Sequence, residues 1–183
     1  EVELAKPKTI DVKSAIYVID DSAYRTFVIT EYPLNVGNAW GSDFFLLDRT
    51  KVTMKFSPVP KFESEKSIDK AIMDMESKLY KTGKSSSVIE LQTHLDTLRE
   101  LLVSLKNNNQ ALFDVNTYVT CEDAAKRDVR AMLKQSGYKF TEMFARQEDA
   151  FISSNLSRRD NMKHNKRGIP TTSLAGVFPF ISS

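Results

Sequence analysis

The sequence predicts an α/β (α+β) fold. We expect a mixed sheet of about four to five strands that starts with a β-hairpin, helices on one face, and a separate antiparallel helical hairpin. Three observations lead to this fold class. Runs rich in β-branched and aromatic residues flank an early turn, apolar residues repeat at coiled-coil spacing in the middle, and strand and helix patterns alternate afterwards. The 183 residues, 41% of them apolar, suffice for one core.

The first strands are predicted by residue type and by turn chemistry. Ala15–Asp20 and Tyr24–Thr30 are rich in Ile, Val, Tyr and Phe, and they flank Asp20-Asp21-Ser22, whose side chains favour a turn. Tyr32-Pro33 should end the second strand, because proline has no N–H to donate to a sheet. These features predict a β-hairpin.

A short helix and a third strand should follow. The apolar residues of the segment from Val36 to Leu47 recur at helical spacing, although Gly37 and Gly41 weaken that pattern. Apolar and polar residues then alternate, with Val52, Met54 and Phe56 on one side. This alternation predicts a half-buried strand closed by prolines, namely Pro58 and Pro60.

The middle of the chain carries two helical seams. Apolar residues are spaced 4, 3, 4 between Ile68 and Leu79, and 3, 4, 3, 4, 3 between Val88 and Leu105. This spacing is typical of coiled coils, and a short connection should fold the two helices into an antiparallel pair. Asn107-Asn108-Asn109 should end the second helix.

The second half alternates between strand and helix. Leu112–Thr120 predicts a strand with Phe113, Val115, Thr117 and Val119 on one side. Thr120 and Asp123 suit the N-cap of a helix ended by Gly137, and its buried face should hold Ala125, Val129, Met132 and Leu133. A short strand over Tyr138–Met143 and a helix over Phe144–Leu156 follow, and the helix should bury Phe151 and Ile152.

Composition favours no particular partner. The formal net charge is +2, and a single cysteine, Cys121, excludes an internal disulfide and fits a reducing compartment. No apolar run approaches the roughly 18 to 20 residues of a membrane span, and the start does not resemble a signal peptide. We therefore expect a cytoplasmic protein.

One stretch resembles part of a phosphate-binding loop. Thr82-Gly83-Lys84-Ser85 matches the end of a P-loop, but the other glycine and the preceding strand are missing. The alternative is structural, with Gly83 ending one helix and Ser87-x-x-Glu90 forming a capping box for the next. We favour the structural interpretation, and a stand-alone nucleotide-binding protein is the alternative.

No catalytic, cofactor-binding or metal-binding residue is assigned. His94 and His164 have no spacing that brings them near Cys121, whose position beside a predicted cap would lower its thiol pKa slightly. Asp20-Asp21 could hold a cation, although a solvated turn is favoured. No cluster has metal-ligand spacing.

Two surface features remain open. A basic run near the end of the chain would serve either as a contact for nucleic acid or acidic lipid, or as a solvated connector, which we favour because no aromatic residues interleave. Trp40, Phe44 and Phe45 would serve as a partner-binding patch or, more simply, as core. The basic run contains Arg158, Arg159, Lys163, His164, Lys166 and Arg167.

The carboxyl end is unusually apolar. Leu174, Val177, Phe178 and Phe180 follow a strongly polar stretch, and such a run is seldom left uncovered. We expect this tail to lead into a further domain. Without that domain it should be disordered, or packed on its own domain or on a neighbouring molecule.

Several segments, taken in order, resemble the N-terminal domain of the conjugative-transfer ATPase of type IV secretion systems, a TraE/TraC-like family with VirB-type relatives. Arg25 is followed by Tyr32-Pro33 and Trp40, and a proline-ended strand precedes a long helical insertion. Leu112–Val119 is similar to the family's "lf-vs-yv" stretch, and Gln147 to Phe151 with Ser154 to its "Q-eaf-s" element.

The most specific match is the tail, which resembles the "R-x-x-x-T-x-x-x-A-x-x-F-P-F" stretch before the family's motor domain. The matching residues are Arg167, Thr171, Ala175, Phe178, Pro179 and Phe180. One departure is Asn155-Leu156-Ser157, where the family often has Leu-Pro before a glycine.

The resemblance implies a non-catalytic docking and assembly domain over residues 1–157 and a basic, then apolar, lead-in over 158–183. ATP and Mg²⁺ would bind only the motor domain, beyond this sequence. The implied partners are membrane subunits of the transfer channel, the chain's own C-terminal ATPase domain and further copies of the protein, and nucleic acid stays open. The implied location is the inner face of the bacterial cell membrane.

Overall fold

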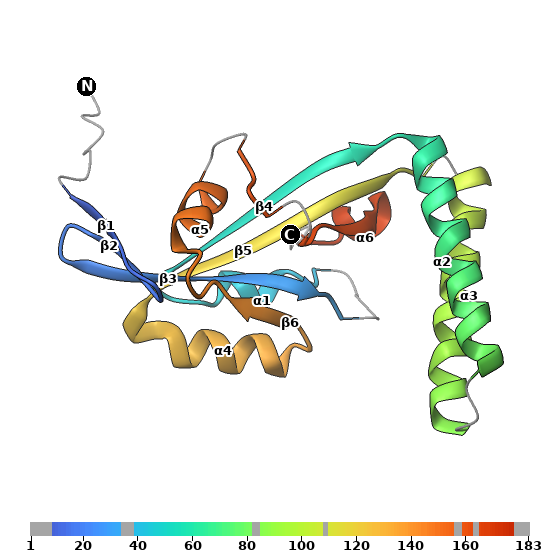
Figure 1. Ribbon diagram of the computed structural model, residues 1–183, viewed down its shortest axis with the longest axis horizontal. Coiled ribbons are helices and arrows are strands. Elements are labelled where there is room, and N and C mark those ends of the chain that lie inside the picture. The colour runs from blue at the N-terminus through green and yellow to red at the C-terminus, as the bar shows by residue number, and fades with distance from the viewer. Residues whose placement is uncertain are drawn as a thin grey trace, which may run out of the picture. The chain divides into compact units, whose positions relative to one another are not determined.

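The computed structural model describes residues 9–33, 39–81, 85–107, 110–155, 159–162 and 165–177. These residues form an antiparallel sheet of seven strands together with six α-helices and one 3₁₀ helix, which confirms the predicted mixed α/β fold class (Figure 1). The strands are β1 (Ile10–Val12), β2 (Tyr17–Ile19), β3 (Ser22–Glu31), β4 (Thr50–Val59), β5 (Leu112–Glu122), β6 (Lys139–Glu142) and β7 (Arg167–Pro170). The sheet therefore holds more strands than the four to five predicted.

The positions of the long helices agree with the sequence-based prediction more closely than the number of strands does. The long ones are α2 (Lys61–Lys81), α3 (Ser85–Asn107) and α4 (Lys126–Gln135). The short ones are α1 (Ser42–Phe45), η1 (Asp123–Ala125), α5 (Gln147–Ser154) and α6 (Thr171–Ala175).

The chain divides into two compact units, each described here by itself. Unit 1 contains Glu1–Phe56, Val115–Arg167 and Gly176–Ser183, and unit 2 contains Ser57–Asp114 and Gly168–Ala175. None of the boundaries between the two units falls at the predicted division between residues 157 and 158. That division separates a docking domain from a lead-in segment by their implied roles, and it stays a prediction. Unit 1 holds most of the sheet, and unit 2 holds the helical pair.

The predicted β-hairpin is confirmed. β2 and β3 pair antiparallel, with Tyr17 opposite Tyr24 and Ile19 opposite Ser22. Asp20 takes a positive φ of 51° at the turn, a conformation that Asp tolerates better than most residues. Strand β1 was not predicted; it has only three residues and pairs with β2.

Strands β3 and β5 lie side by side in the middle of the sheet. The order is β1-β2-β3-β5-β4, with β6 paired to β3 and β7 paired to β5. Every residue from Val115 to Cys121 is buried, whichever face its side chain takes. The strand predicted over Leu112–Thr120 is confirmed as β5, and both faces of the sheet are covered along its buried residues.

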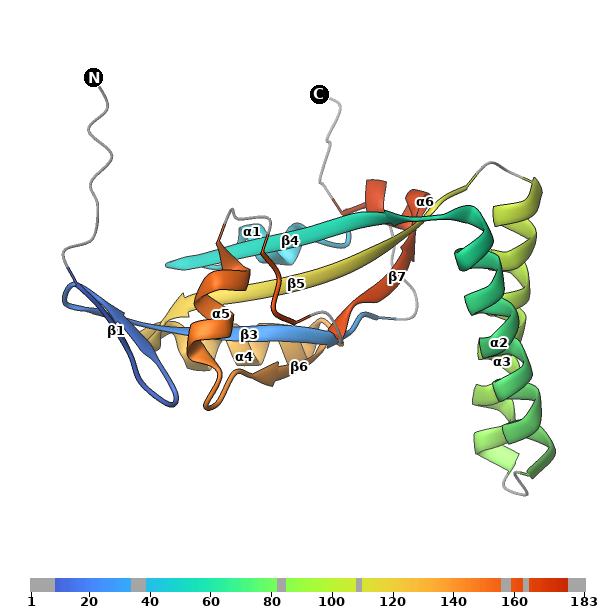
Figure 2. The same cartoon turned by 45° about the horizontal axis from the view of Figure 1, so that its top comes forward.

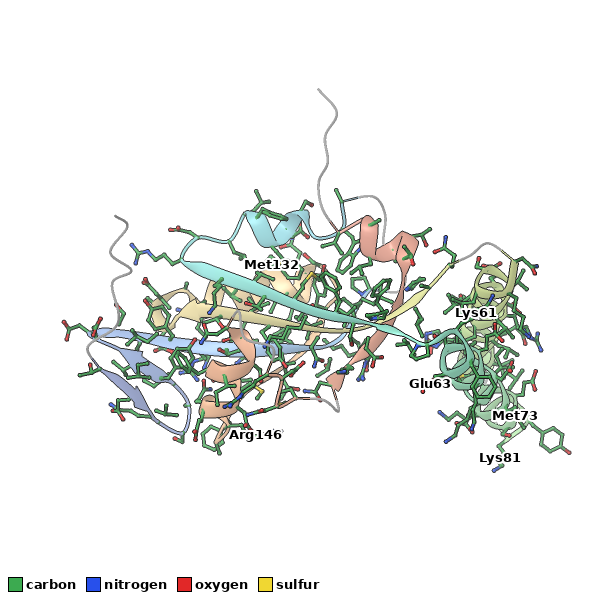
Figure 3. All side chains as sticks on the ribbon, turned by 90° about the horizontal axis from the view of Figure 1, so that it is seen from above. Lys61, Glu63, Met73, Lys81, Met132 and Arg146 are labelled. Atoms are coloured by element: carbon green, nitrogen blue, oxygen red, sulfur yellow. The ribbon has the colours of Figure 1, made fainter. Side chains whose placement is uncertain are left out.

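Different helices cover the two faces of the unit 1 sheet. On one face Val129 and Leu133 of α4, with Phe44 of α1, pack against odd-numbered β3 residues such as Phe27. On the other face Ala150 of α5 packs with Val28. Figure 2 shows α5 and α4 on opposite sides of β3, and Figure 3 labels Arg146 on the α5 side and Met132 on the other. The helices were expected mostly on one face of the sheet; α1 and α4 share one face, and α5 covers the other.

The elements around α4 follow the sequence except at the cap. α4 buries Val129 and Leu133, and Gly137 ends it with a φ of 77°. Neither η1 nor α4 has a side-chain N-cap hydrogen bond, so the predicted cap is wrong. Thr120 instead shares a hydrogen bond with Thr26, and Asp123 pairs with Arg25. The short strand predicted over Tyr138–Met143 is confirmed as β6.

Three predicted elements differ in extent. The helix expected up to Leu47 is reduced to α1 over the described residues, and its predicted start at Val36 lies outside them. β4 continues through Pro58 and leaves Phe56 58% exposed, so its alternation does not mark a buried face. The helix predicted over residues 144–156 is confirmed as the shorter α5, where Phe151 and Ile152 are only half-buried.

In unit 2, α2 and α3 form the predicted antiparallel pair (Figure 1). Ile68 and Leu105 lie in its buried cluster, and Arg99 pairs with Glu76 across the two helices at 2.8 Å. α3 ends at Asn107 as predicted. Ser87 lies inside α3 instead of preceding it, so the predicted capping box is wrong, while Gly83 lies outside the described residues.

Candidate functional site

The basic run was the weak candidate for a contact with nucleic acid or lipid. Arg158, Lys163 and His164 lie outside the described residues. Arg159 is exposed, and its carbonyl accepts a hydrogen bond from the Lys55 ammonium. Lys166 is half-buried and Arg167 is exposed, and the Arg167 guanidinium donates to the Lys166 carbonyl at 3.2 Å. A joint contact of these cations with nucleic acid or acidic lipid stays a prediction.

An acidic residue inside the basic run holds it to the sheet. Asp160 accepts hydrogen bonds from the Tyr118 hydroxyl at 2.6 Å, from the Asn116 amide nitrogen at 2.7 Å and from the Met162 backbone N–H at 3.0 Å. Burial by itself would raise the pKa of Asp160, but the hydrogen bonds from Tyr118 and Asn116 outweigh it and lower the pKa. Burial, together with the neighbouring Asp160 carboxylate, raises the pKa of Tyr118.

The neighbours of Asp160 are packed as well. Met162 is buried in the cluster on the α5 face of the sheet, and the Asn161 backbone N–H donates to the Ser153 hydroxyl at 2.9 Å. The Asn161 side chain donates to Asp149 at 2.8 Å. Residues 159–162 thus form a strap across α5 and β5, which differs from the solvated connector that the charges suggested.

The start of the tail is bonded within unit 2. Thr171 donates its backbone N–H to the Ala111 carbonyl at 2.9 Å, and its hydroxyl accepts the Ala111 N–H at 3.1 Å. A Cβ atom on Gly168 would lie 3.1 Å from the Leu112 side chain, so β7 passes very close to β5. Ile169 is buried.

The last described residues are bonded within unit 1. Trp40 and Gly41 donate their backbone N–H groups to the carbonyls of Gly176 and Val177, at 3.1 and 3.2 Å. A Cβ atom on Gly41 would lie 2.6 Å from the Val177 carbonyl oxygen, so the close approach requires glycine. Val177 is buried. The tail is therefore packed on its own domain as far as Val177, while Phe178, Pro179 and Phe180 lie outside the described residues.

Arg25, the first residue of the family pattern, joins three elements. From β3 its guanidinium pairs with Asp123 of η1 at 2.8 Å and with Glu142 of β6. Burial opposes the charge on Arg25, but the two carboxylates outweigh it and raise its pKa. Glu142 also pairs with Lys126 and Arg130 of α4, at 3.3 Å each. Arg25 therefore connects the sheet to its covering helix.

Other residues of the pattern serve packing. Gln147 is 1% exposed, and its amide nitrogen donates to the Met143 carbonyl at 2.6 Å. The Tyr32 ring lies edge-on to Trp40, with centroids 5.6 Å apart, and its hydroxyl shares a 2.6 Å hydrogen bond with Thr117. Burial raises the pKa of Tyr32 to about 12. Phe151 lies edge-on to Tyr17, while Pro33 is half-buried and Thr171 and Ala175 are exposed.

No family model matches the sequence, and no curated protein matches it. The resemblance to the conjugation ATPases therefore rests on the residues quoted above and stays a proposal.

Cys121 differs from the sequence-based expectation. Its side chain is fully buried on β5, and burial raises the pKa of its thiol to about 11, although the Arg25 charge acts in the opposite direction. The predicted slight lowering of this pKa is wrong, because desolvation of the buried thiol disfavours the thiolate.

Among the residues that the structure describes, the remaining candidates do not assemble into a reactive group. His94 is half-buried on α3, and His164 and Lys84 lie outside the described residues. Asp20 accepts the Thr9 backbone N–H at 3.2 Å at the hairpin turn. Within the described ranges, no three His, Cys, Asp or Glu side chains are grouped to hold a metal ion, and no helix there could cross a membrane.

Proposed function

We propose that this chain is a docking and assembly domain of a conjugative-transfer ATPase, which attaches a motor domain to the membrane subunits of a transfer channel. One observation carries the proposal. The tail that resembles the family's lead-in to the motor is bonded to the residues around Trp40, another position of the same family pattern. Residues far apart in the sequence but belonging to one pattern therefore meet in the fold.

The contact holds the backbone of Gly176 and Val177 against Trp40 and Gly41 in unit 1. Val177 is buried, and Gly41 allows its backbone to approach closely. If a connecting segment is hydrogen-bonded to one domain, the next domain can take only a limited range of positions. A free linker would leave the next domain mobile. A docking domain needs such a restriction, because its proposed role is to hold the motor domain in place at the membrane subunits and not to catalyse a reaction.

Interference with transfer tests the proposal. The chain would be produced in excess in donor cells that carry the transfer system from which it derives, and conjugation frequency would be measured. If the chain occupies the docking positions of the motor, the frequency should fall as its level rises. Phe27→Ala, which removes a core side chain, is the control at matched expression. Unchanged transfer in the presence of the folded chain would contradict the proposal.

Two simpler measurements address its alternatives. Calorimetric titration with Mg-ATP should give no saturable heat, and saturable binding abolished by Lys84→Ala would favour the nucleotide-binding alternative. The coding sequence after Ser183 should contain a strand, a glycine-rich loop ending in Gly-Lys-Ser/Thr and a helix within roughly a hundred residues.

A further inference from the structure

Helix α2 carries a second line of apolar side chains on its outer surface. Phe62, Met73 and Tyr80 are 76%, 67% and 93% exposed, and none of them belongs to the buried cluster of the helical pair. At 3.6 residues per turn, the three positions fall within about 20° of one another around the helix axis. They lie about 110° away from the inner seam that holds Ile68 and Ile72.

The outer surface of α2 is otherwise polar. Apart from these three side chains, every exposed residue of the helix is polar or charged. Six exposed positions, which we call the outer line, follow the 4, 3, 4, 3, 4 spacing of a coiled-coil seam. In chain order they are Phe62, Lys66, Asp69, Met73, Glu76 and Tyr80. Single apolar side chains on a surface need no explanation, but a seam at this spacing is built to meet a facing helix.

The charges on the outer line determine which facing helix fits. In a parallel pair of α2 helices each charged residue would face its own counterpart, and facing like charges oppose association. In an antiparallel pair that overlaps along the whole line, Phe62 faces Tyr80 of the second copy. Lys66 then faces Glu76 of the second copy, and the two-fold symmetry repeats both contacts. The outer line is therefore complementary to itself in the antiparallel direction.

We propose that α2 pairs with the α2 helix of a second copy of this chain, antiparallel and along the outer line. From Phe62 to Tyr80 the contact runs about 27 Å, at 1.5 Å per residue. Only one helix of each copy takes part, and Met73 faces Asp69 in the middle, so we expect a weak dimer with a dissociation constant of about 10–100 µM. This contact does not depend on the proposed function, because it follows from the residues of α2.

The ion pair inside the helical pair is compatible with this contact. Glu76 accepts a hydrogen bond from Arg99 at 2.8 Å, yet 48% of the Glu76 side chain stays exposed. A carboxylate has acceptor sites for several donors, so Glu76 can hold Arg99 and also meet the ammonium of a second copy. Lys66, which would supply that ammonium, is exposed.

Sedimentation equilibrium of the full chain tests the inference. The average mass should rise from that of one chain toward that of two between about 1 µM and about 500 µM. Phe62→Ser should raise the dissociation constant by about thirtyfold, because each dimer loses two aromatic contacts. Phe144→Ser removes the same side chain from an exposed position of unit 1, and this matched control should leave association unchanged.

Charge reversal tests the antiparallel direction. Lys66→Glu alone and Glu76→Lys alone set like charges against each other, so each should associate about tenfold more weakly than the wild type. An equimolar mixture of the two variants restores opposite charges at these positions, and it should associate as strongly as the wild type. A gain in the mixture cannot arise from a folding defect in either variant.

Three outcomes would overturn the inference. The wild type could stay monomeric at about 500 µM, or Phe62→Ser could associate as strongly as Phe144→Ser. The mixture of charge variants could also associate no better than either variant by itself. Neither the motor domain nor conjugation frequency enters this experiment, so the α2 contact and the proposed function fail separately.

Discussion

The sheet of unit 1 and the helical pair of unit 2 bury their apolar residues in different ways. In unit 1, strands β3 and β5 are covered on both faces, and side chains such as Phe27 and Val119 lose all solvent contact. In unit 2, α2 and α3 share a single seam, where only a few residues such as Leu95 and Leu105 reach comparable burial. A two-layer seam leaves the outer half of each helix in water.

This difference determines how each region should respond to change. A side chain with neighbours on all sides leaves a cavity that the surroundings cannot fill, while a seam between two helices can relax toward the missing atoms. Polar side chains such as Asn116 and Gln147 are also buried in unit 1. We therefore expect losses of stability to decrease from the unit 1 core, through the seam and the strap, to the helix surface.

The largest effect is expected in the unit 1 core. Phe27→Ala should lower the free energy of unfolding by about 3–5 kcal/mol, because the ring lies between α4 and the sheet with no solvent contact. Urea unfolding monitored by circular dichroism would measure it. Phe144→Ala removes the same side chain from an exposed position and should change stability by less than about 0.5 kcal/mol. Similar losses for the two variants would contradict the comparison.

A smaller effect is expected in the seam of unit 2. Leu95→Ala should cost about 2–3 kcal/mol, since the facing helix can partly close the gap. Hydrogen exchange should show faster exchange in α2 and α3, with the amides of β3 and β5 still protected. Ile89→Ala, at an exposed position of α3, is the control. Equal acceleration in both units would show that they unfold together.

The strap held by Asp160 should show a dependence on pH. Asp160→Asn would set an amide N–H₂ group against the Asn116 N–H₂ group and should cost about 2 kcal/mol near pH 7. The pKa of Asp160 in the fold is lower than its usual 3.8, so its contribution is present above about pH 4 and is lost as pH falls through the folded value. The difference between the variant and the wild type, measured by urea unfolding, should therefore shrink toward pH 3. A difference that stays constant over this range would show that the carboxylate charge is not involved.

The smallest effect is expected on the surface of the helical pair. Arg99→Gln removes the ion pair with Glu76, whose side chains are both about half exposed, and should cost about 0.5 kcal/mol. Raising the salt concentration to roughly 1 M should remove most of the difference between variant and wild type. A decrease of more than about 1.5 kcal/mol in the free energy of unfolding, measured in urea, would contradict this expectation and show that the ion pair is a major contributor to the stability of unit 2.

The sequence predicts the helical pair better than the sheet for a physical reason. A single seam repeats its apolar residues along each helix, so Ile68 and Leu105 are recognisable from spacing alone. In β5 the spacing carries little information, because Asn116 and Tyr118 are as buried as Val115 and Val119. A strand covered on both faces loses the alternation on which such a prediction depends.

The roles of Asp160 and Gly41 could not be predicted, because they depend on contacts between residues that are distant in the sequence. Asp160 reads as one acid in a basic run, and only its hydrogen bonds with Tyr118 and Asn116 reveal that it holds the strap. Gly41 reads as a helix breaker, whereas the fold uses it for close approach to Val177. Neither partner can be found from local sequence, because each lies more than forty residues away.

Because Cys121 is buried, the reactivity of its thiol reports when unit 1 opens. It is the chain's sole cysteine, its side chain has no solvent contact, and its thiol pKa of about 11 leaves little thiolate at neutral pH. An alkylating reagent should therefore modify it only when β5 becomes accessible. With reagent in excess, the rate of modification measures how often unit 1 opens, without any introduced label and without a signal from the helical pair.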